Sequence, residues 1–375
     1  MVIFSKIILN SSYFLVSMGV DDLIIGVDIN GGDWKNGTHP SERIMKAVQK
    51  YQKFDKKSEI VLFGDFDNLP ARSLDYSRTG YVNAPFYFEN ARRVKRNPRS
   101  VVFEPENTSL FKLLDGLNEG TIDVGVSMHD TQAMVFYSAK KIGMIDGLNV
   151  NVPPLMTMLP SKNNPVLFTD IGSTKDTKPE ELAEFGLLAS KYLELTKGIE
   201  PSIGILSIGS ETSKGNKFVK ETKDILSNMA DEGLLNFDAK SPYVEGHIGL
   251  FDGYKDIVLT DGHTGNISIK LLKGIKDLIG YEFKRITRGP KNVKDYMVLA
   301  SLGLAKASYK NSHFDDMLTR INPATYNGAP LLGLNNYLVK LQGNSTSSEI
   351  FEGLKRVKEY RNSDVISSMR EVIKK

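Results

Sequence analysis

Polar, mostly glycine-containing segments follow several short apolar runs of the sequence, and these segments hold the side chains most able to do chemistry. They are VDINGGD (27–33), VSMHDTQA (126–133), TDIGSTKDTKPEE (169–181), SIGSETSKGN (207–216) and DGHTGN (261–266). Glycine lets a backbone approach a ligand closely, and the N–H groups at helix starts bind anions. One such segment is usually only a tight turn. Several together at one sheet edge predict a site for an anionic ligand.

The common nucleotide-binding loops are missing from the sequence. No GxGxxG follows the first strand, and Lys214 precedes Gly215 and Asn216 rather than the serine or threonine of a P-loop. The absence of cysteine excludes disulfides, thiolate metal sites and a catalytic thiol. No two histidines lie one helical turn apart, so the sequence predicts no metal site. The expected ligand is an anion other than a bound dinucleotide.

Strands and helices alternate along the chain, and they must position these segments. Continuous runs rich in Val, Ile and Leu predict strands buried on both faces, as in a parallel sheet. Such runs occur at 23–29, 59–65, 100–105, 121–127, 165–172, 202–209 and 256–262. Amphipathic helices are predicted at 41–54, 107–120 and 179–195. Repeated strand–helix units predict an α/β protein with a doubly wound, mainly parallel sheet, whose ligands bind at the carboxyl ends of the strands.

Length and composition describe a water-soluble globular protein. The chain has 375 residues, of which 41% are hydrophobic and 25% are charged, and its net charge of +3 is too small to imply nucleic-acid binding. Residues 1–22 are expected to form an extension, because Asn10, Ser11 and Ser12 interrupt the apolar run that a signal peptide or anchor would need. With neither a linker nor a repeat, residues 23–375 are expected to form one α/β domain with a helical projection.

Five motifs resemble, in order and approximate spacing, those of the phosphate acyltransferase (PlsX) family of bacterial phospholipid synthesis. They are VDINGGD, DIGSTKDTKPEEL, SIGSETSKGN, DGHTGNISIK and YNGAPLLGLN (326–335). The resemblance implies a Rossmann-like three-layer α/β/α sandwich, related to isocitrate dehydrogenases and phosphate acetyltransferases, and usually a homodimer. It also implies conversion of an acyl-[acyl-carrier protein] and inorganic phosphate into acyl phosphate and free carrier protein, with no metal or organic cofactor.

The resemblance assigns catalysis to Lys178 and Asn266. Phosphate is an anionic nucleophile and a thiolate is a good leaving group, so direct attack on a thioester needs positioning and charge stabilisation more than a covalent intermediate. Lys178 would neutralise the phosphate or the oxyanion, and Asn266 would donate a hydrogen bond to the oxyanion. From the residues alone, the alternatives are a solvated lysine at a helix start and a helix N-cap. The expected phosphate- or acyl-donor-binding positions are Asp28, Gly31, Gly32, Asp33, Ser127, Thr131, Asp170, Lys214, Gly215, Asn216, Asp261, Thr264 and Gly265.

Residues 127–133 depart from the family pattern. The family reads S-A-G-N-T-G-A where this chain reads SMHDTQA, so both glycines are replaced and Asp130 takes the place of an asparagine. Its carboxylate would repel phosphate unless Lys178 or Lys214 pairs with it. Two alternatives therefore stay open: a non-catalytic relative that binds carrier protein or membrane as a scaffold, and a phosphate acyltransferase that uses acyl-coenzyme A.

Two basic segments suggest partners. The run ARRVKRNPR (91–99) could dock the acidic acyl-carrier protein, although a solvated surface is the alternative. Residues 268–288 predict a basic amphipathic helix with Leu278 and Phe283 on its apolar side. Such a helix can lie on an anionic bilayer, or it can pack against the core or a dimer partner. The resemblance implies a cytoplasmic protein with peripheral membrane contact, and no nucleic-acid-binding module is recognised.

Overall fold

The computed structural model describes residues 23–33, 40–64, 79–83, 108–288, 297 and 327–373. The predictions for the extension 1–22, the basic run 91–99 and the strand at 100–105 lie outside these residues.

The first sheet has six strands in the order β10-β11-β4-β1-β2-β3. They are β1 (Ile24–Asp28), β2 (Glu59–Gly64), β3 (Thr79–Asn83), β4 (Val124–Ser127), β10 (Ala329–Pro330) and β11 (Tyr337–Lys340). All neighbours are parallel except the short β10, which pairs antiparallel with β11. The runs predicted at 23–29, 59–65 and 121–127 form β1, β2 and β4.

The second sheet has five strands in the order β5-β6-β9-β7-β8. They are β5 (Met156–Leu159), β6 (Val166–Thr169), β7 (Ile203–Leu206), β8 (Tyr243–Val244) and β9 (Ile257–Leu259). Only β5 is antiparallel to its neighbour. The runs predicted at 165–172, 202–209 and 256–262 form β6, β7 and β9.

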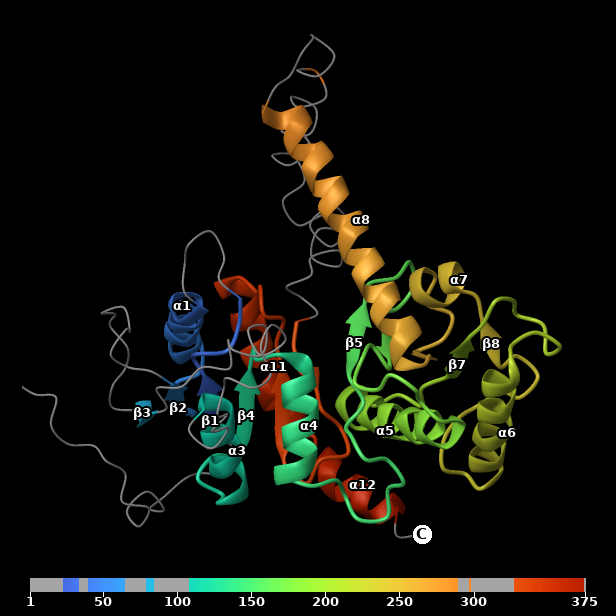
Figure 1. Ribbon diagram of the computed structural model, residues 1–375, viewed down its shortest axis with the longest axis horizontal. Helices are drawn as coiled ribbons and strands as arrows, with labels where there is room; N and C mark the ends of the chain where they lie inside the picture. The colour runs from blue at the N-terminus through green and yellow to red at the C-terminus, as the bar shows by residue number, and fades with distance from the viewer. Residues whose placement is uncertain are drawn as a thin grey trace, which may run out of the picture.

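Helices on opposite faces of the first sheet make three layers (Figure 1). In β2, Ile60 and Leu62 join the hydrophobic cluster that includes α1, whereas Val61 and Phe63 join the cluster that includes α3. This alternation is the two-residue period of a strand covered on both sides. The described helices are α1 (Pro40–Phe54), α3 (Ser109–Asn118), α4 (Thr131–Lys141), α5 (Pro179–Lys197), α6 (Lys217–Asp231), α7 (Gly246–Phe251), α8 (Gly262–Arg288), α11 (Ser347–Asn362) and α12 (Val365–Ile373). The predicted α/β class is confirmed.

The two sheets meet through antiparallel pairings. β10 is antiparallel to β11, Leu155 and Leu331 form an antiparallel bridge, and β5 is antiparallel to β6. These three successive reversals make the parallel strands of the second sheet run opposite to those of the first. The polar segments therefore fall at two carboxyl edges, one in each sheet, whereas we expected a single edge.

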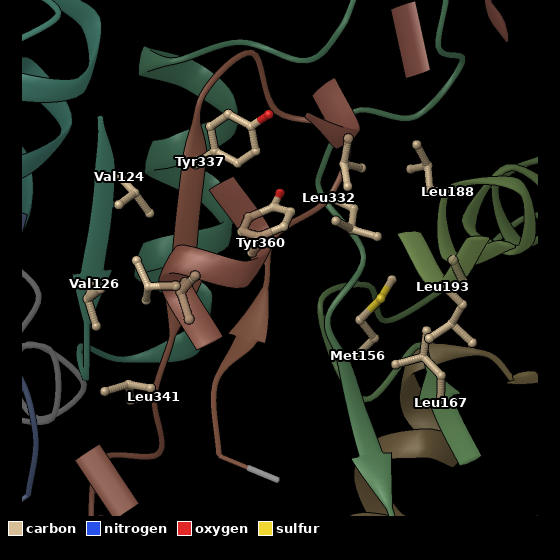
Figure 2. Close-up of a cluster of buried hydrophobic side chains, with 14 of the residues drawn as sticks. Val124, Val126, Met156, Leu167, Leu188, Leu193, Leu332, Tyr337, Leu341 and Tyr360 are labelled. Atoms are coloured by element: carbon tan, nitrogen blue, oxygen red, sulfur yellow. The ribbon is translucent and has the colours of Figure 1, made fainter. Parts of the chain in front are cut away.

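A continuous apolar core joins the sheets. Figure 2 shows Val126 and Leu341 on the side of the first sheet, and Met156 and Leu167 on the side of the second. All four belong to one cluster of buried side chains. Because interiors pack at the density of organic crystals, this cluster fixes the two sheet edges relative to one another.

The helix α8 leaves the second sheet and extends away from the body of the molecule (Figure 1). It contains the basic amphipathic segment predicted at 268–288, although the side chain of Phe283 lies outside the described part. Several of its apolar side chains are exposed, including Leu271 at 63% and Leu278 at 61%. Within the described residues, no helix is long and apolar enough to cross a membrane.

Candidate active site

The loop after β6 is built around the carboxylate of Asp170. Oδ1 accepts hydrogen bonds from the backbone N–H groups of Gly172 and Ser173, both at 3.0 Å, and Oδ2 accepts from Thr174 N at 2.9 Å and from Thr174 Oγ1 at 2.8 Å. Three successive N–H groups of this kind form a site for an anion. The chain fills the site with its own fully buried carboxylate. Asp170 thus supports the loop, and these N–H groups do not face an external phosphate.

The start of α8 lies directly against this loop. Thr177 Oγ1 accepts a hydrogen bond from Gly262 N at 3.2 Å, and a Cβ placed on Gly265 would lie 1.8 Å from the carbonyl oxygen of Asp170. Only glycine permits such an approach. Asp261 caps the helix, since its Oδ1 accepts from Thr264 N at 2.9 Å. Asp261 and Gly265 therefore hold the helix against the loop, while the side chain of Thr264 is exposed.

The two predicted catalytic residues border this same junction. Lys178 is exposed and precedes the first residue of α5, next to Thr177, and its backbone N–H donates to Glu181 Oε2 at 2.9 Å. Asn266 lies one turn into α8 and half-buried, and its Nδ2 would lie 2.6 Å from a Cβ placed on Gly172. The alternative for Asn266, a helix N-cap, is wrong because Asp261 occupies that position. The structure thus brings a lysine and a side-chain amide to one loop–helix junction.

The segment 207–216 follows β7, which neighbours β9 in the same sheet. Gly215 has φ of +85°, and Asn216 caps α6 by accepting from Val219 N at 2.9 Å through Oδ1. Lys214 is exposed. The side-chain oxygen of Asn216 is therefore used by its own helix, which leaves the Lys214 ammonium as the ligand-accessible group of this segment.

At the carboxyl edge of the first sheet, Asp28 is the centre of a second polar cluster. Its Oδ1 accepts from Asn30 N at 3.0 Å and from Gly31 N at 3.1 Å, and its Oδ2 accepts from Ser127 Oγ at 2.6 Å. Ser127 Oγ in turn accepts from His129 N at 3.0 Å. Because the serine hydroxyl donates to Asp28, this group is not arranged as a Ser–His–Asp nucleophile.

Gly31 and Gly32 fit between this cluster and the segment after β11. A Cβ on Gly31 would lie 2.8 Å from His129 N, and Gly32 has φ of +118°. Asp33 N donates to Gly343 O at 2.7 Å, and its exposed side chain lies beside the Gly343 α-carbon. The glycines are thus required by close packing of the chain on itself.

The segment 127–133 does not place Asp130 as expected. Asp130 caps α4, since Oδ1 accepts from Gln132 N at 3.0 Å and from Ala133 N at 3.1 Å, and Thr131 is the first helical residue. Across the described residues, no ion pair joins Asp130 to Lys178 or Lys214, the two lysines considered as its partners. The charge that Asp130 influences is instead that of Lys340.

Lys340 is a site residue that the sequence analysis missed. It ends β11, is only 8% exposed, and its Nζ donates to the carbonyl oxygen of Leu341. Burial lowers the pKa of Lys340 to about 8, against the opposing effect of the carboxylates of Asp130, Asp33 and Asp28. Burial also lowers the pKa of nearby His129, so the imidazole is neutral at pH 7. A lysine ending a short apolar run gives no sequence signal, because most such lysines are solvated.

No group of three or more His, Cys, Asp or Glu side chains in the described segments is arranged to hold a metal ion. The candidate site therefore consists of two polar edges. One carries Lys178, Lys214 and Asn266, and the other carries the Asp28 cluster with Lys340. The charge of Lys273 on α8 adds to the lowering of the Lys340 pKa.

Comparison with known proteins shows the family to which this chain belongs. A family model described as fatty acid synthesis protein matches residues 23–368. The phosphate acyltransferase of Staphylococcus saprophyticus is 27% identical over 352 residues, covering 93% of this chain and 98% of the relative. That of Staphylococcus haemolyticus is 28% identical over 351 residues, with the same coverage. The resemblance found in the five motifs is confirmed over nearly the whole chain.

Solved structures with a similar fold include two phosphotransacetylases. A phosphotransacetylase from Streptococcus pyogenes has a TM-score of 0.54 at 14% identity, and covers 91% of this chain and 94% of its own. The EutD phosphotransacetylase from Staphylococcus aureus has a TM-score of 0.52 at 15% identity, with the same coverage. At these identities the likeness concerns the fold, and it confirms the predicted phosphate acetyltransferase-like architecture.

Proposed function

The chain belongs to the fatty acid synthesis protein family, and from this membership we propose that it transfers the acyl group of an acyl-[acyl-carrier protein] to inorganic phosphate. Its curated relatives are named phosphate acyltransferase. The observation that carries the proposal is the junction of the β6–α5 loop with the start of α8: Thr177, next to Lys178, contacts Gly262, and Gly172 lies against Asn266. A cation and an amide donor are the groups that an attacking phosphate and a developing oxyanion require.

The reaction needs no group beyond those of the substrates and the site. A phosphate oxygen attacks the thioester carbonyl carbon, and a C–O bond forms as the carbonyl oxygen becomes an oxyanion. The oxyanion collapses, the C–S bond breaks, and the carrier thiolate leaves and takes up a proton. Lys178 offsets the charge of the phosphate, and Asn266 donates through Nδ2 to the oxyanion. Both interactions strengthen as charge develops on the reacting carbonyl, which is how they lower the barrier.

Formation of acyl phosphate is the direct test. Purified protein, inorganic phosphate and acyl-carrier protein are expected to yield acyl phosphate, trapped as a hydroxamate, together with free carrier thiol in equal amount. A parallel reaction with acyl-coenzyme A decides between the two donors, because the carrier protein is expected to give the higher kcat/KM. Absence of product from folded protein with either donor would instead favour the non-catalytic scaffold.

We further propose that the exposed apolar side of α8 contacts a membrane surface, which suits a lipid-synthesis enzyme that is otherwise cytoplasmic and homodimeric. Leu271, Ile275 and Leu278 follow one another at helical spacing and are 63%, 46% and 61% exposed. Lys270 and Lys273 flank them and are also exposed. An apolar stripe beside lysines is the pattern of a helix lying on an anionic bilayer.

The membrane proposal predicts that L271S/L278S lowers binding to anionic vesicles at least about tenfold, because each leucine would lose its buried area in the bilayer. Flotation with phosphatidylglycerol vesicles measures the binding. Y254S is the matched control, since Tyr254 is 69% exposed but lies outside α8. Unchanged flotation together with a shift from dimer to monomer in light scattering would assign the stripe to the dimer interface and overturn the membrane proposal.

A further inference from the structure

Three polar residues form a row across neighbouring strands at the carboxyl edge of the first sheet. Lys340 pairs in register with Ser127, and Ser127 lies beside Asp28 on the next strand, where its Oγ donates to Oδ2 at 2.6 Å. Residues in register on parallel strands project from the same face. All three are buried, with Asp28 at 1%, Ser127 at 0% and Lys340 at 8% exposure. In α/β proteins this edge is where ligands bind.

Not all N–H donors of the Lys340 ammonium have an acceptor among the described residues. Its Nζ donates to the carbonyl oxygen of Leu341, and across the described residues it makes no ion pair. An ammonium carries three donors, so two of them have no acceptor among the residues that the structure describes. Among the described residues, Lys340 forms no ion pair with Asp28, Asp33 or Asp130; Asp28 accepts from Asn30 N, Gly31 N and Ser127 Oγ, and Asp130 accepts from the first turn of α4. A buried ammonium with unfilled donors is costly unless a ligand completes it.

The charges around Lys340 select the kind of ligand. Asp28, Asp33 and Asp130 all act on its charge, and together they would repel a phosphate dianion. An uncharged acceptor such as a carbonyl oxygen meets no such repulsion. The lysines of the other edge, Lys178 and Lys214, are exposed, so water screens the charges of the acidic residues near them, Glu181 and Glu211. Phosphate is therefore expected beside Lys178 and Lys214, and an uncharged part of the acyl donor beside Lys340.

We propose that Lys340 binds the acyl donor, by donating a hydrogen bond from its buried ammonium to a carbonyl oxygen of the thioester substrate other than the reacting one. This inference rests on the proposed function, because it takes an acyl thioester to be the ligand. The Asp28–Ser127 pair then acts as a positioning element, which holds the adjacent strand end against the lysine. Met128 and His129, where the family has smaller residues, line the same edge and are buried.

The titration of Lys340 gives this role a distinctive pH dependence. Burial lowers its pKa to about 8, Asp130, Asp33 and Asp28 oppose the lowering, and Lys273 on α8 adds to it. The imidazole of His129 also faces the cluster. A lysine is cationic below its pKa, so the charged donor is present at pH 7 and is lost as the pH rises through about 8. Donor affinity should fall in the same interval, while arginine at this position would stay charged.

Kinetics with the two substrates varied separately test the inference. K340M is expected to raise the donor KM about ten- to a hundredfold, the effect of losing a hydrogen bond from a charged donor, with the phosphate KM within twofold of wild type. K340R is expected to restore part of the affinity and to abolish the rise of donor KM above pH 8. The matched control is K197M, because Lys197 is exposed and pairs with Glu359 at 2.6 Å, at a distance from both edges.

Calorimetry can measure how tightly the carrier-protein thioester binds when no phosphate is present. It therefore tests the inference independently of turnover. Weaker binding in folded K340M, with weakening of wild-type binding above pH 8, supports it. If K340M does not fold, K340Q and the pH profiles of wild type and K340R carry the test. Unchanged donor affinity in these variants, or an equal rise in the phosphate KM, would overturn the role of Lys340. An inactive wild type that binds the thioester through Lys340 would count against the proposed function alone.

Discussion

Replacement of Lys178 by alanine is expected to lower kcat about a hundred- to a thousandfold, and N266A should have an effect of similar size. These are the losses measured when one preorganised donor to a developing oxyanion is removed. Neither variant should unfold the protein, because Lys178 is exposed and the side chain of Asn266 makes no hydrogen bond that holds the start of α8. Acyl phosphate formation at saturating donor and phosphate, with melting temperatures recorded alongside, measures the effect.

Controls for these two variants lie in the same segments. Lys175 is an exposed lysine in the same loop as Lys178, and His263 is exposed one turn before Asn266. K175A and H263A should keep kcat within about threefold of wild type, as expected for exposed side chains outside the chemistry. If K178A and N266A behaved like these controls, the catalytic centre would have to be sought at the other edge, around Lys340.

Gly265→Ala is expected to cost both stability and activity. Its added methyl group would lie 1.8 Å from the carbonyl oxygen of Asp170, a backbone atom that cannot rotate away. The helix start or the loop must therefore move, which costs about 1–3 kcal/mol of unfolding free energy or more. Because the same movement displaces Asn266, and a misplacement of about 1 Å can cost about a hundredfold in rate, kcat should fall by that order. Denaturant unfolding and the acyl phosphate assay measure the two effects.

Gly274 provides the matched control within the same helix. A Cβ placed there meets no atom within 4 Å, so G274A should stabilise α8 by about 0.5–1 kcal/mol and leave kcat unchanged. Equal behaviour of G265A and G274A would show that the contact between α8 and the loop does not position Asn266.

The elements that could be predicted are those whose signal is local. Strands β1, β6 and β9 follow from unbroken apolar runs, and α5 follows from its initial proline and its amphipathic pattern. The division into two sheets could not be predicted, because it depends on which distant strands pair. β10 and β11 are short and come from the far end of the chain, yet they complete the first sheet. The hydrophobic pattern of a strand shows which side chains are buried, but it does not show which distant strand pairs with it.

The positions of the polar segments were predictable, but their contacts only in part. The glycine and polar segments do follow strand ends, and Thr177, next to Lys178, contacts the start of the helix that carries Asn266. Glycine-rich segments were interpreted as cradles for an external anion, whereas the loops after β1 and β6 wrap around their own Asp28 and Asp170. Whether an N–H group turns toward a ligand or toward a neighbouring carboxylate depends on side-chain geometry within a few residues. That choice has no signature in residue type or spacing.

The strands of the first sheet come from distant parts of the chain, and this affects how the protein folds during synthesis. β4 is translated before β11, the strand that covers its outer edge, and α1 is translated before α11, the helix that packs on it. Until then β4 presents open backbone groups, a template for wrong pairing with other nascent chains. The N-terminal half of the polypeptide is therefore not an autonomous folding unit. A truncation before residue 327 would remove β10 and β11, and with them one side of the first sheet.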